Sequence, residues 1–411
     1  MRKSVLPFLY PMIMLALSSC GSSYKGERIP PNSPFDDDVA FLKKYSEVIV
    51  LQSSDGKSSV AVMPGLQARV ITSTAGAPDN LSYGWINRTL FQSGDTSVRM
   101  NAFGGEERIW LGPEGGQFSL FFPKDSAFTF ENWHTPRLID LDAFDKVEVT
   151  SRSAKFAKSA SLTNYSGTQF TIRIEREIKV LEGTDAYSHL GVAAPANLSS
   201  VAYQTVNRLE NRGSTPWSKE TGLLSIWLLG MYNPSPGLTV VIPYVAGSPS
   251  LGPVVNDDYF GKVPADRLRI ADSVIYFKGD GQYRSKIGLS PSRTKDVMGS
   301  YDPASKTLTI VKFSKGAPDD IYVNSKWEIQ QQPFKGDVIN AYNDGPPSPG
   351  AKPMGPFYEL ESSSPARELQ SGQSIEHTQT TYHFQGEERA LSEIASKVLG
   401  VSISEVRSAF K

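Results

Sequence analysis

The sequence predicts an all-β protein built as one large antiparallel domain. Many short segments rich in β-branched and aromatic residues follow one another between residues 47 and 384. Turn-forming clusters such as NYSG, NPSPG and NDGPP separate these segments. Short strands at such regular spacing favour a sandwich or a barrel over a parallel sheet with crossover helices.

Length and composition agree with a single large core. The chain has 411 residues, of which 39% are hydrophobic and 10% aromatic. The formal net charge of −1 gives no electrostatic reason to expect nucleic acid as a partner. Because no break in composition divides the strand region, we expect one β domain over residues 39–387.

The N-terminus has the pattern of a targeting segment. Arg2 and Lys3 precede an apolar stretch over residues 5–17, which is too short for a membrane span. The sequence LSSC that follows resembles the bacterial lipobox, which implies a signal peptide over 1–19 and lipidation of Cys20. An ordinary signal peptide with a chance cysteine is the alternative, but Cys20 is the only cysteine in the chain.

The resemblance to a lipobox implies an exported protein anchored by acyl chains on Cys20. Gly21 follows the cysteine where the inner-membrane retention signal has Asp, so we expect the outer membrane. Whether the protein faces the periplasm or the cell surface stays open. Residues 20–38 are rich in Pro, Gly and Ser and are expected to form a lipidated tether. Asp36 to Asp38 are then placed to cap a helix over 39–46.

The strands are expected wherever β-branched and aromatic residues concentrate between turn signals. In chain order they cover residues 47–53, 59–63, 68–74, 89–91, 97–101, 108–111, 118–122, 146–152, 159–164, 170–180, 200–209, 223–229, 238–244, 269–277, 284–289, 298–302, 307–313, 321–330, 338–341, 357–362 and 375–384.

The C-terminal residues 388–411 predict two short helices packed on the β domain. Apolar residues recur at helical spacing over 388–399, and Gly400 is placed as a stop. Ser402 and Glu405 then form a capping-box pattern. The pair looks superficially like a DNA-binding helix-turn-helix. Because an exported, acidic protein does not meet DNA, we expect instead a helical hairpin docked on the β domain.

The stretch GGEERIWLGPEGG, residues 104–116, predicts one wall of a ligand pocket. Its centre has strand character, and glycine pairs at both ends allow sharp turns or close approach to a ligand. Charged residues lie at both ends of this strand, which is how an all-β protein presents a polar site.

Three stretches resemble the galactose mutarotase-like superfamily. They are VAVMPGLQARVITST near the start, GPFYELES over 355–362 and LQSGQSIEHTQTTYHF over 369–384. The resemblance implies a β-supersandwich of two large antiparallel sheets, a sugar or glycan as partner, and Glu361 as the equivalent of the family's catalytic glutamate. The chain looks like an uncharacterised bacterial branch of this superfamily and not like a true aldose 1-epimerase.

Two departures from that family concern its histidines. Glu114 stands in the segment PEGG, where true mutarotases have His-Gly-Gly. The family's second histidine, its general acid, has no counterpart in residues 210–230. Because ring opening needs an acid and a base on opposite sides of the sugar, the chemistry is expected to have changed or been lost.

The candidate catalytic residues are Glu114, Glu361 and His134. Two carboxylates facing a sugar can act as acid and base, or as nucleophile and acid in glycoside cleavage. Alternatively they hydrogen-bond sugar hydroxyls or pair with Arg108, and His134 is either a replacement acid or a turn residue with a structural hydrogen bond. Glu106, Glu107 and Glu359 are interpreted as rim or solvent-facing charges.

The candidate substrate-binding residues are Arg108, Trp110, Trp133, Lys286 and Arg293. A guanidinium on the pocket strand can clamp hydroxyls or a uronate, or can form a structural ion pair. The two tryptophans suit the apolar face of a pyranose, although most tryptophans of a β-sandwich are core.

The other polar residues give weaker indications of a functional site. The cluster Asn340, Asn343 and Asp344 fits turn chemistry. His377 and His383 are expected to lie on one face of a strand, as packing or surface residues, and His189 is expected in a loop. The sequence has no zinc signature and no cofactor motif.

Three functions remain open from the sequence. The first is a carbohydrate-processing protein, as an epimerase, lyase or glycoside hydrolase. The second is a noncatalytic glycan-binding lipoprotein, and the third is a structural envelope protein that binds another protein. The oligomeric state is not predicted.

Overall fold

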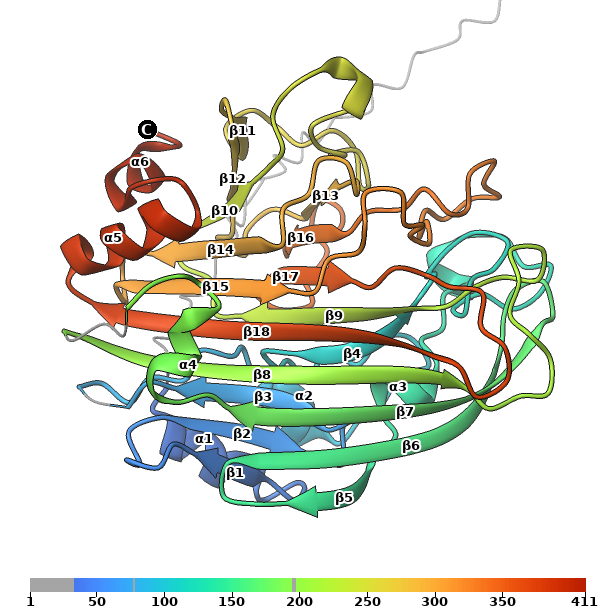
Figure 1. The fold of residues 1–411 in the computed structure, drawn as a ribbon, viewed down its shortest axis with the longest axis horizontal. Coiled ribbons are helices and arrows are strands. Elements are labelled where there is room, and N and C mark those ends of the chain that lie inside the picture. Colours follow the sequence, from blue (N-terminus) through green and yellow to red (C-terminus); the bar gives the residue numbers. More distant parts are fainter. Residues whose placement is uncertain (1–32, 77, 194–196) are drawn as a thin grey trace, which may run out of the picture.

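The computed structural model describes residues 33–76, 78–193 and 197–411 (Figure 1). The expected signal peptide, Cys20 and nearly all of the expected tether lie outside these residues. The tether was expected to reach residue 38, but a helix already begins at Phe35.

Three antiparallel sheets form the protein. The largest has ten strands in the order β11-β12-β10-β14-β15-β18-β8-β7-β6-β5. These strands are β5 Asp145–Val149, β6 Ser153–Thr163, β7 Gln169–Val180, β8 Leu198–Asn211, β10 Thr239–Pro243, β11 Leu268–Ile270, β12 Val274–Lys278, β14 Val297–Asp302, β15 Thr307–Phe313 and β18 Ser374–Gly386.

The second and third sheets continue each other. The five-stranded sheet has the order β13-β16-β17-β9-β4, and the three-stranded sheet the order β1-β2-β3. An isolated bridge between Val70 and Glu107 connects β3 to the start of β4. The strands are β1 Ile49–Gln52, β2 Ser59–Met63, β3 Arg69–Thr74, β4 Arg108–Gly112, β9 Ser225–Tyr232, β13 Ser285–Leu289, β16 Ile339–Asn343 and β17 Tyr358–Ser363.

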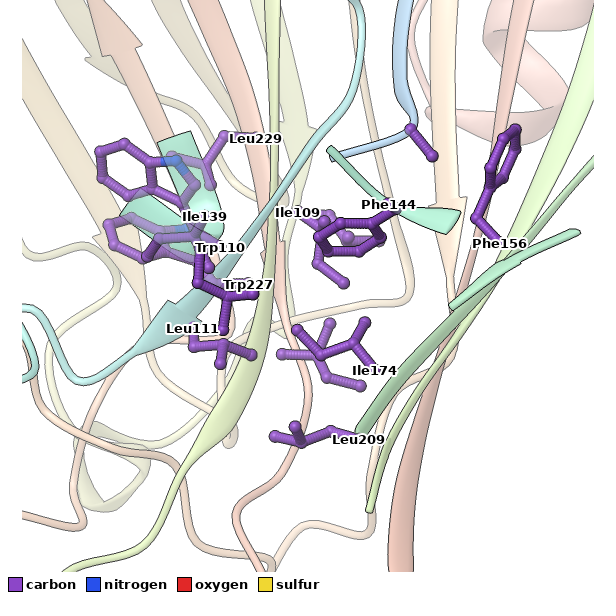
Figure 2. Packing of buried hydrophobic residues seen from close by; sticks show 14 of the residues in the cluster. Ile109, Trp110, Leu111, Ile139, Phe144, Phe156, Ile174, Leu209, Trp227 and Leu229 are labelled. Carbon is purple, nitrogen blue, oxygen red and sulfur yellow. The ribbon is translucent and has the colours of Figure 1, made fainter. Parts of the chain in front are cut away.

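The hydrophobic core lies between the ten-stranded sheet and the two smaller ones. Ile109 and Leu111 of β4 belong to one cluster with Ile174 of β7 and Leu209 of β8, and Figure 2 shows these side chains. A second cluster joins the other ends of the same sheets, with Leu360 of β17 among its members. The predicted large antiparallel sandwich is therefore confirmed.

Two helices cover part of the outer face of the ten-stranded sheet. At the C-terminus α5 and α6 pack on the ten-stranded sheet, with Leu391, Ala395 and Ile403 in one cluster with Phe384 of β18 (Figure 1). The predicted helical pair and the capping box at Ser402 are confirmed. The helices and 3₁₀ turns are α1 Phe35–Leu42, α2 Arg88–Ser93, η1 Phe130–Asn132, α3 Arg137–Asp140, α4 Gly183–Ser188, η2 Pro249–Leu251, α5 Glu388–Val398 and α6 Ile403–Ser408.

Some predicted elements differ from the structure. Residues 89–91 lie in helix α2, because Asn87 accepts the backbone N–H of Leu90 and starts a helix there. The segments 97–101, 118–122 and 321–330 form loops, and 269–277 is divided into β11 and β12. Helix α1 begins four residues before the predicted 39, so Asp36 to Asp38 form its first turn instead of capping it.

Glu106 and Glu107 are fully buried between the sheets, so the prediction that they are surface charges is wrong. Glu107 accepts hydrogen bonds from Arg176 at 2.7 Å and from Gln379 at 2.8 Å, and Glu106 lies 3.0 Å from the Nε2 atom of His383. A buried carboxylate is tolerated only when it is paired in this way. The partners come from β7 and β18, far away in the sequence, so the strand pattern around 106–107 could not reveal them.

Gly104 is expected to tolerate no side chain. Its φ is +96°, and a Cβ there would lie 2.0 Å from the carbonyl oxygen of Trp85. We expect Gly104→Ala to lower the free energy of unfolding by about 3 kcal/mol or more. Gly56→Ala is the matched control, because Gly56 has φ +69° but open space around it, and should cost only about 1 kcal/mol. If urea unfolding showed equal losses of stability in the two variants, the backbone at residue 104 would have moved to relieve the close contact with Trp85.

Candidate functional site

A cavity of about 780 Å³ opens on the outer face of the five-stranded sheet. Side chains alternate along each strand of this sheet, so one face enters the core and the other faces the cavity. In Figure 2, Trp110 of β4 lies with Trp227 and Leu229, while Ile109 lies beside Phe144. The sheet contributes these lining residues: Arg108, Trp110, Gly112, Ser225, Trp227, Leu229, Lys286, Asn340, Tyr342, Glu359 and Ser363.

Loops build the rest of the wall. They contribute Met100, Glu114, Phe130, Trp133, Asn256, Asp258, Tyr259, Phe260, Arg284, the segment 323–328, Lys335, Asp337, Asp344 and Lys352, among others. The stretch over residues 104–116 therefore does form one wall of the cavity, as its pattern indicated. Gly115 lets the segment 323–328 pack closely, because a Cβ there would lie 2.3 Å from the carbonyl oxygen of Lys326.

Lys286 is the central cation of the cavity wall. Its Nζ atom lies 3.1 Å from Oε2 of Glu361 and 4.8 Å from the ring centre of Trp227. Glu361 is fully buried, lies behind Lys286 and Trp227, and also accepts the indole N–H of Trp227 at 3.0 Å. Glu361 thus holds Lys286 in place, while Glu114 is the member of the predicted carboxylate pair that reaches the cavity surface.

The electrostatics of these groups are coupled. Burial works to lower the pKa of Lys286, but Glu361, Glu114 and Glu359 together outweigh it, so that its pKa is raised and it stays charged. Burial raises the pKa of Glu114 to about 7; Glu361 adds to this, and Lys286 and the indoles of Trp327 and Trp133 oppose it. A carboxyl group with such a pKa can both donate and accept a proton near neutral pH.

Arg108 pairs with Glu359, and not with Glu114 or Glu361. Glu359 lies two residues before Glu361 on β17, so both side chains project from the same face. Glu359 is buried, with its pKa raised to about 8 by burial against the opposing charge of Arg108, so the prediction of a rim charge is wrong. The guanidinium also lies 4.9 Å from the ring centre of Trp110.

Three buried polar atoms of residues that line this wall have no hydrogen-bond partner among the described residues. They are Nε of Arg108, Nε1 of Trp110 and Oγ of Ser225. Each such group left unpaired costs about 1–3 kcal/mol, and native proteins pair most of them. Their concentration at one cavity indicates a place built for a ligand that both donates and accepts hydrogen bonds.

Two predicted site residues lie away from the cavity. His134 is exposed and does not line it, and its backbone N–H donates to the carbonyl of Phe121. Arg293 is buried and donates to the backbone carbonyls of Val245, Ser248 and Gly252, so it fixes a loop. His377 and His383 are buried packing residues of β18.

Several lining residues were missed from the sequence. Asn340 and Tyr342 alternate with the core residues Ile339 and Ala341 on β16, a pattern that predicts a two-faced strand instead of turn chemistry. Trp327 was placed on a predicted strand but lies in a loop, stacked at 5.8 Å on Trp133. No local pattern indicated that contact, because the two residues are nearly 200 positions apart.

The pKa of Glu114 gives the stability of the protein a pH dependence. Its ordinary value of 4.5 is raised to about 7 in the folded protein, so the folded state keeps a proton that the unfolded chain has lost. The stabilising contribution of Glu114 to the free energy of unfolding is fully present below pH 4.5 and is lost as the pH rises through 7. We expect the free energy of unfolding to fall more over this range in the wild type than in Glu114→Gln. Parallel curves from urea unfolding at a series of pH values would contradict this.

The described part of the chain contains neither a metal-binding cluster nor a membrane-spanning helix. No cluster of three or more His, Cys, Asp or Glu side chains there is arranged to hold a metal ion. No helix in residues 33–76, 78–193 or 197–411 is long and apolar enough to cross a membrane.

Fold and site together define a large antiparallel β-sandwich protein with a polar, aromatic-lined cavity on its smaller face. The chain belongs to a protein family of unknown function (DUF6786), which matches residues 33–410. No curated protein sequence matches it.

The chain is also similar to several solved structures. The Slr1438 protein from Synechocystis sp. PCC 6803 shares 13% identity, with 83% of this chain and 96% of that chain covered and a TM-score of 0.48. A galactose mutarotase-like protein from Lactobacillus casei ATCC 334 shares 11% identity over 82% and 100%, with a TM-score of 0.47. A galactose mutarotase related enzyme from Lactobacillus acidophilus shares 10% identity over 82% and 97%, with a TM-score of 0.44. At these values the likeness carries no function over to this chain.

Proposed function

We propose that this protein binds a saccharide in the cavity of the five-stranded sheet and processes it by proton transfer at Glu114. The observation that carries the proposal is the combination of a wall of tryptophans with unpaired donors and acceptors at Arg108, Trp110 and Ser225. A pyranose has the matching surface, because its C–H face packs on aromatic rings and its hydroxyls both donate and accept.

Glu114 and Lys286 would divide the chemistry between them. Glu114 faces the cavity with a pKa of about 7, so it is suited to give a proton to a sugar oxygen or to take one from it. Lys286 stays protonated, so it is suited to stabilise negative charge that develops on the same sugar. In this proposal Glu361 is a positioning residue, because it contacts Lys286 and Trp227 and not the cavity.

A noncatalytic glycan-binding protein is the second candidate, and one observation favours it. Glu361, which the sequence resemblance matches to the mutarotase-like glutamate, is held by Lys286 and Trp227 behind the wall. A carboxylate in these contacts does not reach a substrate unless Lys286 moves. This candidate predicts that binding survives Glu361→Gln and that no product forms.

The direct test is a glycan array probed with the full-length chain purified in detergent, followed by product analysis on every glycan that binds. Trp327→Ala, which removes an aromatic group of the cavity wall, should abolish binding. Tyr45→Ala is the matched control, because Tyr45 is exposed and lies outside the cavity. Absence of any glycan binding by the wild type would rule out both candidates.

We further propose that the protein is exported and anchored to the bacterial outer membrane by acyl chains on Cys20. The support is the sequence LSSC after an apolar segment and the single cysteine of the chain. Cys20→Ser is expected to prevent incorporation of a labelled fatty acid and to release the protein from the membrane fraction. Unchanged labelling of the variant would contradict the proposal.

A further inference from the structure

We propose that the ligand is a glycan chain of several residues that crosses the cavity mouth, and not a free monosaccharide. This inference rests on the proposed saccharide function and names its substrate class. Three features carry it: the width of the cavity, two aromatic series on its opposite sides, and exposed apolar side chains where those series reach the mouth.

The cavity is wider than one sugar ring. Its lining runs from Trp110 on the edge strand β4 to Tyr342 on β16, with β9 and β17 between them. Three strand spacings correspond to ~14 Å. Cavities of roughly 300–1,000 Å³ hold ligands of drug size, whereas a free hexose has only about twelve non-hydrogen atoms.

The first aromatic series lies beside β4. Phe130 is 54% exposed at the mouth and is stacked at 6.1 Å on Trp133, which is stacked at 5.8 Å on Trp327. The guanidinium of Arg99 lies 4.8 Å from the ring centre of Phe130 and holds one face of that ring. The series therefore leads from the interior of the cavity onto its rim.

The second series lies beside β16 and has the same design. Phe260 is 44% exposed and packs edge to face at 6.0 Å on Tyr342, which lies 5.8 Å from Phe357. The guanidinium of Arg284 lies 3.9 Å from the ring centre of Phe260, and the structure shows no ion pair or hydrogen bond to it from any described residue. An arginine in this position offers donors to a passing chain.

Exposed apolar side chains stand among charged ones at the mouth of the cavity. Phe130, Phe260 and Met354 line it and are among the few large hydrophobic side chains of the described residues that are exposed. Exposed apolar groups gathered around a cavity indicate a binding surface. A monosaccharide bound deep beside Glu114 leaves both rim phenylalanines uncovered, whereas a chain through the cavity covers them.

The test is to measure binding of the full-length chain to homologous saccharide series, from monosaccharide to hexasaccharide. The probes are malto-, cello-, xylo-, manno- and chito-oligosaccharides and oligogalacturonides, together with any series found on the glycan array. For the series that binds, affinity should rise at least about tenfold from monosaccharide to tetrasaccharide. The double variant Phe130→Ala/Phe260→Ala should lose most of this gain. Both residues are exposed, so their loss is not expected to unfold the protein.

Each outcome decides between the proposals. Equal affinity for all lengths, or an equal loss at all lengths in the double variant, overturns the glycan-chain inference and leaves the saccharide function standing. Absence of binding in every series overturns both. Val147→Ala/Val149→Ala, exposed apolar residues of β5 away from the cavity, is the matched control and should change nothing.

Discussion

Replacing Lys286 with methionine is expected to lower the free energy of unfolding by about 3–5 kcal/mol, because it leaves a buried carboxylate without its cation. Glu361 is fully buried, and its contacts are the ammonium group of Lys286 at 3.1 Å and the indole N–H of Trp227 at 3.0 Å. A methionine fills much of the same volume as the lysine. The loss of stability therefore measures the effect of the missing charge and not of changed packing.

Two further variants isolate the ion pair. Lys286→Met/Glu361→Gln removes both charges and is expected to recover most of the lost stability. Lys352→Met removes an exposed lysine that lines the same cavity and should change stability by less than about 0.5 kcal/mol. Urea unfolding of all four proteins measures the effect. A Lys286→Met protein as stable as the wild type would contradict a stabilising ion pair between Lys286 and Glu361.

Replacing Glu114 with glutamine is expected to lower turnover of a processed glycan by about 10²–10⁴-fold and to leave its binding nearly unchanged. Glutamine keeps the size of the side chain and one acceptor oxygen but can neither give nor take the proton. The pH dependence of the rate should also change, because the group with a pKa of about 7 is gone.

Glu328→Gln is the matched control for this prediction, because Glu328 lines the same cavity but is exposed at its rim. Its turnover should equal that of the wild type. Full turnover in Glu114→Gln would remove Glu114 from the mechanism. A wild-type protein that binds a glycan and forms no product would instead support the noncatalytic function.

The sequence was most informative where local patterns decide the structure. The charges and glycines around β4 indicated a pocket wall, and Arg108, Trp110 and Glu114 do line the cavity. The capping box at Ser402 is likewise a local signal, since its two partners lie three residues apart. The antiparallel sandwich followed from strand spacing and turn chemistry in the same way.

What the sequence could not show depends on contacts between distant strands. Glu106 and Glu107 have the residue type of surface charges, and only the partners brought by β7 and β18 make their burial possible. Arg293 was predicted to bind the substrate as a charged residue of the chain. The fold instead turns it toward loop carbonyls, which satisfy its guanidinium.

The most direct test of the account is a crystal structure of the protein with the best-binding oligosaccharide. We expect one sugar ring against Trp110 or Trp133, a hydroxyl or ring oxygen within hydrogen-bond distance of Glu114, and further sugar residues of the glycan on Phe130 or Phe260. Density for the oligosaccharide elsewhere on the surface, with the cavity of the five-stranded sheet holding only water, would contradict it.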